Sequence, residues 1–188
     1  MSSFQVVDTT TRWRAGFLVL DEAHVVSRDG EEFTRSVVRH PGAVVVVPVE
    51  ADGQHALLVR QFRVATGGDL LELVAGKRDV DGESPETTAH RELEEEIGHR
   101  AKRLVKLCEF YNSPGFTDEY THLYCALDLE VLDAPRGVTA EERVMTVERI
   151  ALDDVEQKIA AREVIDAKTI IGLLITRRFL AGEYPGVA

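Results

Sequence analysis

The chain has 188 residues and a mass of 20.9 kDa, which is enough for one sizeable domain or for one domain with a small appendage. A composition of 44% hydrophobic and 29% charged residues excludes collagen-like, disordered and disulfide-scaffold proteins. The formal net charge of −11 repels nucleic-acid backbones and anionic membranes, so we expect neither as a partner.

Three features of the sequence bear on the cellular compartment: the length of its apolar runs, its N-terminal residues and its cysteines. No apolar run approaches the roughly 20 residues of a membrane-spanning helix. The N-terminal residues MSSFQVVDTT lack the pattern of a signal peptide, and Cys108 and Cys125 are too few for a disulfide framework. We therefore expect a cytoplasmic, reduced protein without a membrane span.

The first part of the chain has strand character. Residues 13–38 alternate short apolar stretches with turn signals, which predicts an antiparallel β region that we place at residues 1–40. Three β-branched and apolar runs follow, and they predict core strands at 43–49, 55–62 and 70–74. These runs open a second, larger domain at residues 41–188.

A helix and then further strands follow the three core runs. Ser84 and Pro85 are typical of a helix start, and Gly98 is typical of a helix end. The remaining pattern predicts strands at 101–111, 119–129 and 144–151, an exposed loop at 130–143, and helices at 153–163 and 166–180. An apolar stripe of Ile170, Ile171, Leu174 and Ile175 marks the core face of the last helix. Strands with helices between and after them predict an α/β/α layered domain.

The helix after Ser84 carries a candidate metal site. On a helix Glu92, Glu95 and Glu96 share one sector, beside an apolar sector formed by Ala89, Leu93 and Ile97. Like charges at this spacing destabilise a helix unless a cation compensates them. Mg²⁺ prefers such oxygen ligands and fills its other positions with water and substrate phosphate. A solvated acidic surface helix is the alternative that the residues alone leave open.

The segment from Gly76 to Gly98, GKRDVDGESPETTAHRELEEEIG, resembles the Nudix box, G-x5-E-x7-R-E-U-x-E-E-x-G-U with U aliphatic. The residues that match in register are Glu83, Arg91, Glu92, Leu93, Glu95, Glu96 and Gly98. The segment departs from the pattern in two places: one extra residue stands between Gly76 and Glu83, and the last position is His99. The resemblance implies a Nudix-type α/β/α sandwich with a mixed sheet that hydrolyses a nucleoside diphosphate linked to another group.

Residues beyond the box resemble the ADP-ribose pyrophosphatase subgroup. They are the segment NSPGFTDE at 112–119, in which Pro114 stands sixteen residues after Gly98, together with LLELVAGK at 70–77 and RSVVRHPGAV at 35–44. The subgroup implies an enzyme that cleaves ADP-ribose to AMP and ribose 5-phosphate. GDP-mannose or another nucleoside diphosphate sugar is the alternative substrate. A non-catalytic module that senses ADP-ribose is a third reading, which the intact box glutamates disfavour.

The resemblance also implies roles for single residues. Glu92, Glu95, Glu96 and the Ala75 carbonyl would hold Mg²⁺, with Mn²⁺ as a possible substitute. Glu141 or Glu142 in the long loop would act as the general base, with Glu95 as a further catalytic candidate. Arg91 would pair with Glu83, and the residues implied as substrate contacts are Trp13, Arg35, Arg60, Arg63, Lys77 and Glu119. Taken alone, the loop glutamates would be read as solvated and Arg60 as an exposed strand residue.

The N-terminal region and the same resemblance together predict how the subunits assemble. A small sheet of about 40 residues cannot bury two faces by itself and needs a partner surface. In the subgroup that partner is the second subunit, so we expect a C₂ homodimer in which Trp13 and Arg35 lie near the neighbour's substrate site. Folding back of the region onto its own domain is the alternative.

Overall fold

The computed structural model describes residues 3–132 and 142–187 and divides the chain into two compact units. The first comprises residues 1–42 together with 110–121, and the second comprises 43–109 and 122–188. The first unit therefore differs from the predicted N-terminal region by including the turn-rich segment at 110–121. The backbone N–H of Val38 donates to the Phe116 carbonyl oxygen at 2.8 Å, which joins the two segments.

The first unit contains a three-stranded antiparallel sheet in the order β1–β2–β3. Its strands are β1 (Phe4–Ala15), β2 (Leu18–Ser27) and β3 (Glu32–Arg39). The sequence interpretation started the strands too late, because β1 begins at Phe4. The missed half is rich in Val and Thr, whose branched side chains favour strands even where they are exposed.

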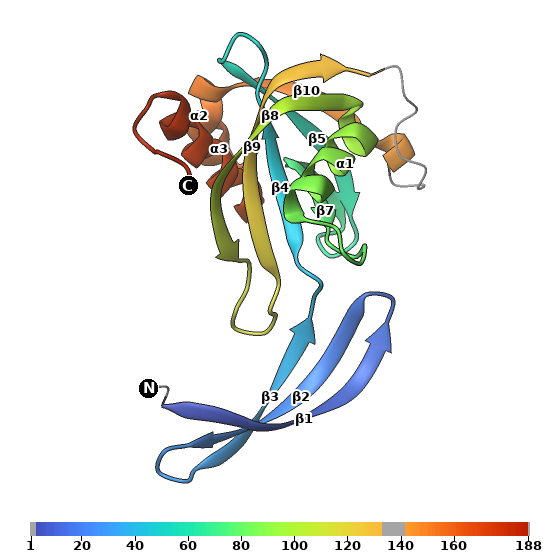
Figure 1. Ribbon diagram of the computed structural model, residues 1–188, viewed down its shortest axis with the longest axis vertical. Helices are drawn as coiled ribbons and strands as arrows, with labels where there is room; N and C mark the ends of the chain where they lie inside the picture. The colour runs from blue at the N-terminus through green and yellow to red at the C-terminus, as the bar shows by residue number, and fades with distance from the viewer. Residues whose placement is uncertain (1–2, 133–141, 188) are drawn as a thin grey trace. The chain divides into compact units, whose positions relative to one another are not determined.

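The second unit contains two sheets, which Figure 1 shows with helices on both sides. One has the order β7–β4–β9–β8, formed by β7 (Val74–Lys77), β4 (Ala43–Pro48), β9 (Tyr120–Val131) and β8 (His99–Tyr111). The other has the order β10–β5–β6, formed by β10 (Thr146–Ala151), β5 (His55–Arg63) and β6 (Gly68–Glu72). The helical segments are η1 (Glu142–Val144), η2 (Leu152–Asp154), α1 (Pro85–Ile97), α2 (Val155–Ala160) and α3 (Ala167–Leu180).

Helix α1 has the ends that the sequence predicts. The Ser84 hydroxyl accepts a hydrogen bond from the Thr87 backbone N–H at 3.1 Å, and Pro85 follows as the first helical residue. Gly98 adopts the left-handed conformation at φ 65°, and its N–H donates to the Glu94 carbonyl oxygen. The core between α1 and β4 holds Leu93 and Val46, both fully buried.

Helix α3 covers the other face of β4, and its predicted core face is wrong. The buried positions are Thr169, Gly172, Leu173 and Thr176, whereas the predicted isoleucine and leucine stripe is only half-buried. The cause is Gly172, where an added Cβ would lie 2.4 Å from Leu73 Cδ1. A glycine at this point lets the helix backbone approach the sheet, so small and hydroxyl side chains form the contact. No helix in the described part of the chain is long and apolar enough to cross a membrane.

Candidate active site

Two carboxylates of α1 lie against consecutive residues of β7. The Ala75 backbone N–H donates to Glu96 Oε2 at 3.3 Å. Gly76 leaves room for Glu92, because a Cβ added at this glycine would lie only 1.9 Å from Glu92 Cδ. Glu92 and Glu96 are one helical turn apart, so both point toward the same two strand residues.

The helix core fixes the direction of this pair. Leu93 and Ile97 have no exposed surface and pack in the cluster that contains Val44 and Val46 of β4. Each follows directly after one of the two glutamates, so the rotation of α1 that buries these apolar side chains also sets the place of Glu92 and Glu96.

Burial makes the site electrostatically costly without a cation. The Glu92 side chain is 12% exposed, and burial raises the pKa of its carboxyl above the usual range, although Arg91 opposes the shift. Glu96 is buried as well. Two such carboxylates, with a third nearby, favour the binding of a positive charge.

Arg91 is a cation that contacts two of the three box carboxylates, Glu92 and Glu95. Its guanidinium lies 2.7 Å from Glu92 Oε1 and 2.9 Å from Glu95 Oε2. The contact expected between Arg91 and Glu83 is also present, at 3.3 Å. The Thr88 hydroxyl donates to the same Glu83 carboxylate at 2.9 Å, so Glu83 ties the preceding loop to the helix. Hydrogen bonds from Arg91 and Thr88 hold the pKa of Glu83 below its usual range.

The donor set fits a hard divalent cation. Glu92, Glu95, Glu96 and the Ala75 carbonyl offer oxygen atoms only, and the Glu95 side chain, at 45% exposed, reaches solvent. The space that Gly76 leaves is filled by the Glu92 carboxylate rather than by an apolar side chain. These residues therefore suit Mg²⁺ or Mn²⁺ together with water and substrate oxygens.

Three cationic residues predicted as substrate contacts have carboxylate partners. Arg60 forms a two-pronged contact with Glu148 across β5 and β10. Lys77 lies 3.5 Å from Asp79. Arg63 donates from Nε and Nη2 to the two oxygens of Glu72, at 2.7 and 2.8 Å. Their roles toward substrate stay predictions.

Glu72 is a buried carboxylate that the sequence interpretation treated as part of a core strand. It is 1% exposed and receives Arg63 directly, with Lys168 Nζ 3.8 Å away. The hydrogen bond to Glu72 raises the pKa of Arg63, and the charge of Glu96 raises it further, so this pair lies in the electrostatic surroundings of the box. The available signal was one acidic residue inside the apolar run LLELV.

The other predicted residues lie in the first unit, outside the described residues, or in η1. Trp13, Arg35 and Glu119 belong to the first unit, where Trp13 is 54% exposed and the Arg35 guanidinium lies 4.4 Å from the centre of the Phe33 ring. Glu141 lies outside the described residues, and Glu142 begins η1. The assignment of the base therefore stays a prediction.

A second acidic group lies elsewhere in the second unit, and it already holds a cation. Glu50, Asp52 and His55 come together at the turn between β4 and β5. The Arg149 guanidinium bonds to both Glu50 and Asp52, the latter at 2.9 Å. The single charge of Arg149 thus offsets one of the two carboxylate charges in this group.

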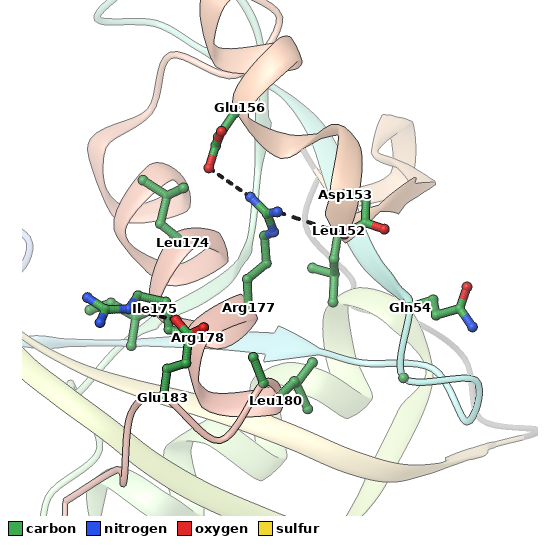
Figure 2. A pocket seen from close by; sticks show the side chains of 12 residues that line it. Gln54, Leu152, Asp153, Glu156, Leu174, Ile175, Arg177, Arg178, Leu180 and Glu183 are labelled. Carbon is green, nitrogen blue, oxygen red and sulfur yellow. Dashed lines mark hydrogen bonds and ion pairs between the residues drawn. The ribbon is translucent and has the colours of Figure 1, made fainter.

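A pocket of about 710 Å³ lies beside α2 and α3, and none of the box residues line it. Figure 2 shows the side chains that form its wall. Leu152, Leu174 and Leu180 form part of its wall. Arg177 points across it and bonds to Glu156 at 3.0 Å. Leu174 and Ile175, which were predicted to belong to the core face of α3, instead line this pocket.

Comparison with known proteins identifies the pattern of the box. A model of the NUDIX domain matches residues 38–170. The chain is 44% identical over 141 residues to an ADP-ribose pyrophosphatase of Bacillus subtilis, covering 75% of each protein. It is 37% identical to a methanol dehydrogenase activator of Bacillus methanolicus, covering 77% of each. A GDP-mannose pyrophosphatase of Cronobacter sakazakii is 31% identical, over 77% of this chain and 78% of that one.

The fold has a solved counterpart. The crystal structure of an ADP compounds hydrolase superposes with a TM-score of 0.83 at 23% sequence identity, covering 97% of both chains. The predicted α/β fold class is thereby confirmed. The carboxylates of α1 lie one helical turn apart against Ala75 and Gly76, and Arg91 contacts Glu83. Together with the matching domain model, this geometry shows that the chain belongs to the Nudix hydrolase family.

Proposed function

We propose that this enzyme hydrolyses the diphosphate bond of ADP-ribose to give AMP and ribose 5-phosphate, using Mg²⁺. The observation that carries the proposal is the placement of Glu92 and Glu96 against Gly76 and Ala75. The substrate class is supported by the B. subtilis relative, whose name states that activity.

The roles of the residues follow from their chemistry. Glu92, Glu95, Glu96 and the Ala75 carbonyl would hold the metal, and Arg91 would keep the first two carboxylates in place through its existing contacts. A bound divalent cation supplies charge for the diphosphate and lowers the pKa of a water molecule. Glu141 or Glu142 accepts the proton of the attacking water. Arg63 and Lys77 provide cations for phosphate oxygens.

A hydrolysis panel tests the substrate. ADP-ribose, GDP-mannose, a UDP-sugar and a dinucleotide would each be incubated with Mg²⁺, and again with a chelator, and the products separated by chromatography. We expect AMP from ADP-ribose only when Mg²⁺ is present. Preferential turnover of GDP-mannose would favour the activity named for the C. sakazakii relative. Absence of hydrolysis of every compound would favour a sensing or activating role.

We also propose that the protein is a cytoplasmic C₂ homodimer in which Trp13 and Arg35 complete the partner's substrate site. Support comes from β1, which is exposed over its whole length and presents Phe4, Val6, Val7 and Trp13. Both cysteines are free, in keeping with a reducing compartment.

A mixing experiment tests the shared site. A Glu96→Gln chain and an Arg35→Ala chain, each inactive alone, would regain activity after subunit exchange, because one pocket of each heterodimer would carry neither change. A monomer in sedimentation velocity, or no recovery after exchange has been verified, would contradict the proposal.

A further inference from the structure

A chain of four polar side chains connects the box loop to β8 and β9 in the second unit. Arg78 lies in the loop between β7 and α1, and its Nη1 is 3.5 Å from Nε2 of His122 on β9. On the other side of the ring, His122 Nδ1 is 2.7 Å from Glu109 Oε1 on β8. The Lys106 ammonium binds the same carboxylate oxygen.

Glu109 beside Nδ1 and Arg78 beside Nε2 both favour the same tautomer of the neutral His122 ring. An ionised carboxylate only accepts hydrogen bonds, so the proton of a neutral imidazole stands on Nδ1. Nε2 is then an acceptor, and it faces a guanidinium that only donates. The order Lys106, Glu109, His122, Arg78 therefore has a donor and an acceptor at each step.

Burial and the neighbouring charges favour the neutral form of the His122 imidazole. His122 is 9% exposed, and burial lowers the pKa of its imidazole. Arg78 from the loop and Lys106 from β8 lower it further, while Glu109 opposes them. Tyr124, on the same strand, has its pKa raised by burial and stays protonated. At neutral pH the ring is thus an acceptor for Arg78, and protonation would place N–H against N–H.

We propose that His122, which lies between Glu109 and Arg78, is a positioning residue that acts through Arg78 to hold the box loop on β9. The inference rests on the proposed hydrolysis at this site. Arg78 directly follows Lys77 and stands three residues after Ala75, so its anchoring limits the freedom of both. The loop is also where the chain departs from the box pattern, by one extra residue.

The test combines kinetics with hydrogen exchange. We expect His122→Leu to raise KM for the hydrolysed nucleotide about tenfold with a smaller change in kcat, the size expected from losing one hydrogen bond to a charged group. His122→Gln keeps an acceptor and should restore most of this loss. Amide exchange of residues 78–83 should rise in His122→Leu and return toward wild type in His122→Gln. His55→Gln is the matched control, because His55 Nδ1 has the same 2.7 Å contact with a carboxylate, that of Asp52.

Two further measurements separate positioning from general stability. If His122 acts through Arg78, the double variant His122→Leu, Arg78→Leu should be no worse than either single variant. The wild-type KM should rise as the pH falls below the usual imidazole value of about 6.5, and His122→Gln should lack this rise. Additive losses, or unchanged loop exchange in folded His122→Leu, would overturn the proposal.

If His122→Leu does not fold, the same kinetic and exchange measurements on Arg78→Leu and His122→Gln test the proposal. The exchange measurement needs no substrate, so it distinguishes a wrong loop assignment from a wrong activity.

Discussion

Replacing Gly76 by alanine tests the geometry of the site with one methyl group. The new Cβ would lie 1.9 Å from Glu92 Cδ, and the carboxylate would have to move until the contact reaches at least 3.4 Å. Gly76 does not have a positive φ, so alanine suits its backbone and should change the free energy of unfolding by no more than about 1 kcal/mol. A misplacement of about 1 Å costs roughly a hundredfold in rate, and we expect at least that loss in kcat.

The assay compares Gly76→Ala with Gly68→Ala. Gly68 has no neighbour within 4 Å of an added Cβ and no positive φ, which makes it a matched control. Both variants would be measured for Mg²⁺-dependent turnover, Mg²⁺ affinity and thermal unfolding. The expected pattern is normal unfolding in both, with weak metal binding and slow turnover only in Gly76→Ala. Equal turnover in the two variants would refute the placement of Glu92, and a large loss of stability in Gly76→Ala would show that the backbone, not the carboxylate, is disturbed.

Three other predictions concern carboxylates that would be replaced by glutamine. Glu96→Gln should lower turnover at least about a thousandfold with a normal melting curve, because it removes charge from the metal site and leaves an oxygen for Ala75; near-normal activity would contradict the metal assignment. Glu141→Gln or Glu142→Gln should slow single-turnover hydrolysis without changing Mg²⁺ affinity, and two fully active variants would return the base to the box. Glu72→Gln should cost about 3 kcal/mol in urea unfolding, since it leaves a guanidinium without its carboxylate; a shift under 1 kcal/mol would contradict a structural role for the pair.

Local signals predicted the helix of the box and the sector of its carboxylates. Ser84, Pro85 and Gly98 act within one turn of the helix ends, and the i, i+4 relation of Glu92 and Glu96 depends only on helix geometry. Such features do not depend on how the rest of the chain packs. For that reason the residues alone already indicated three carboxylates on one face, and the box resemblance supplied their chemistry.

The face of α3 and the buried Glu72 could not be predicted in the same way. Hydrophobic periodicity favoured Leu174, whereas the close approach at Gly172 turned Thr169 and Thr176 inward. Thr169 contributes a hydroxyl that accepts the Leu73 backbone N–H at 3.0 Å, a contact across many residues that no local pattern contains. Likewise, Glu72 is tolerated in this strand because Arg63 reaches it from the neighbouring strand and Lys168 lies 3.8 Å away.

The core and the proposed metal site of α1 cannot change independently. Leu93 and Ile97 are fully buried, and each directly follows one of the two carboxylates that meet β7. A helix that rotated to repack these side chains would carry Glu92 and Glu96 with it, away from Gly76 and Ala75. Interiors pack at near-crystal density, so even a one-methylene change at Leu93 is felt by its neighbours. The apolar residues of this helix therefore determine where its glutamates lie as well as how its core packs.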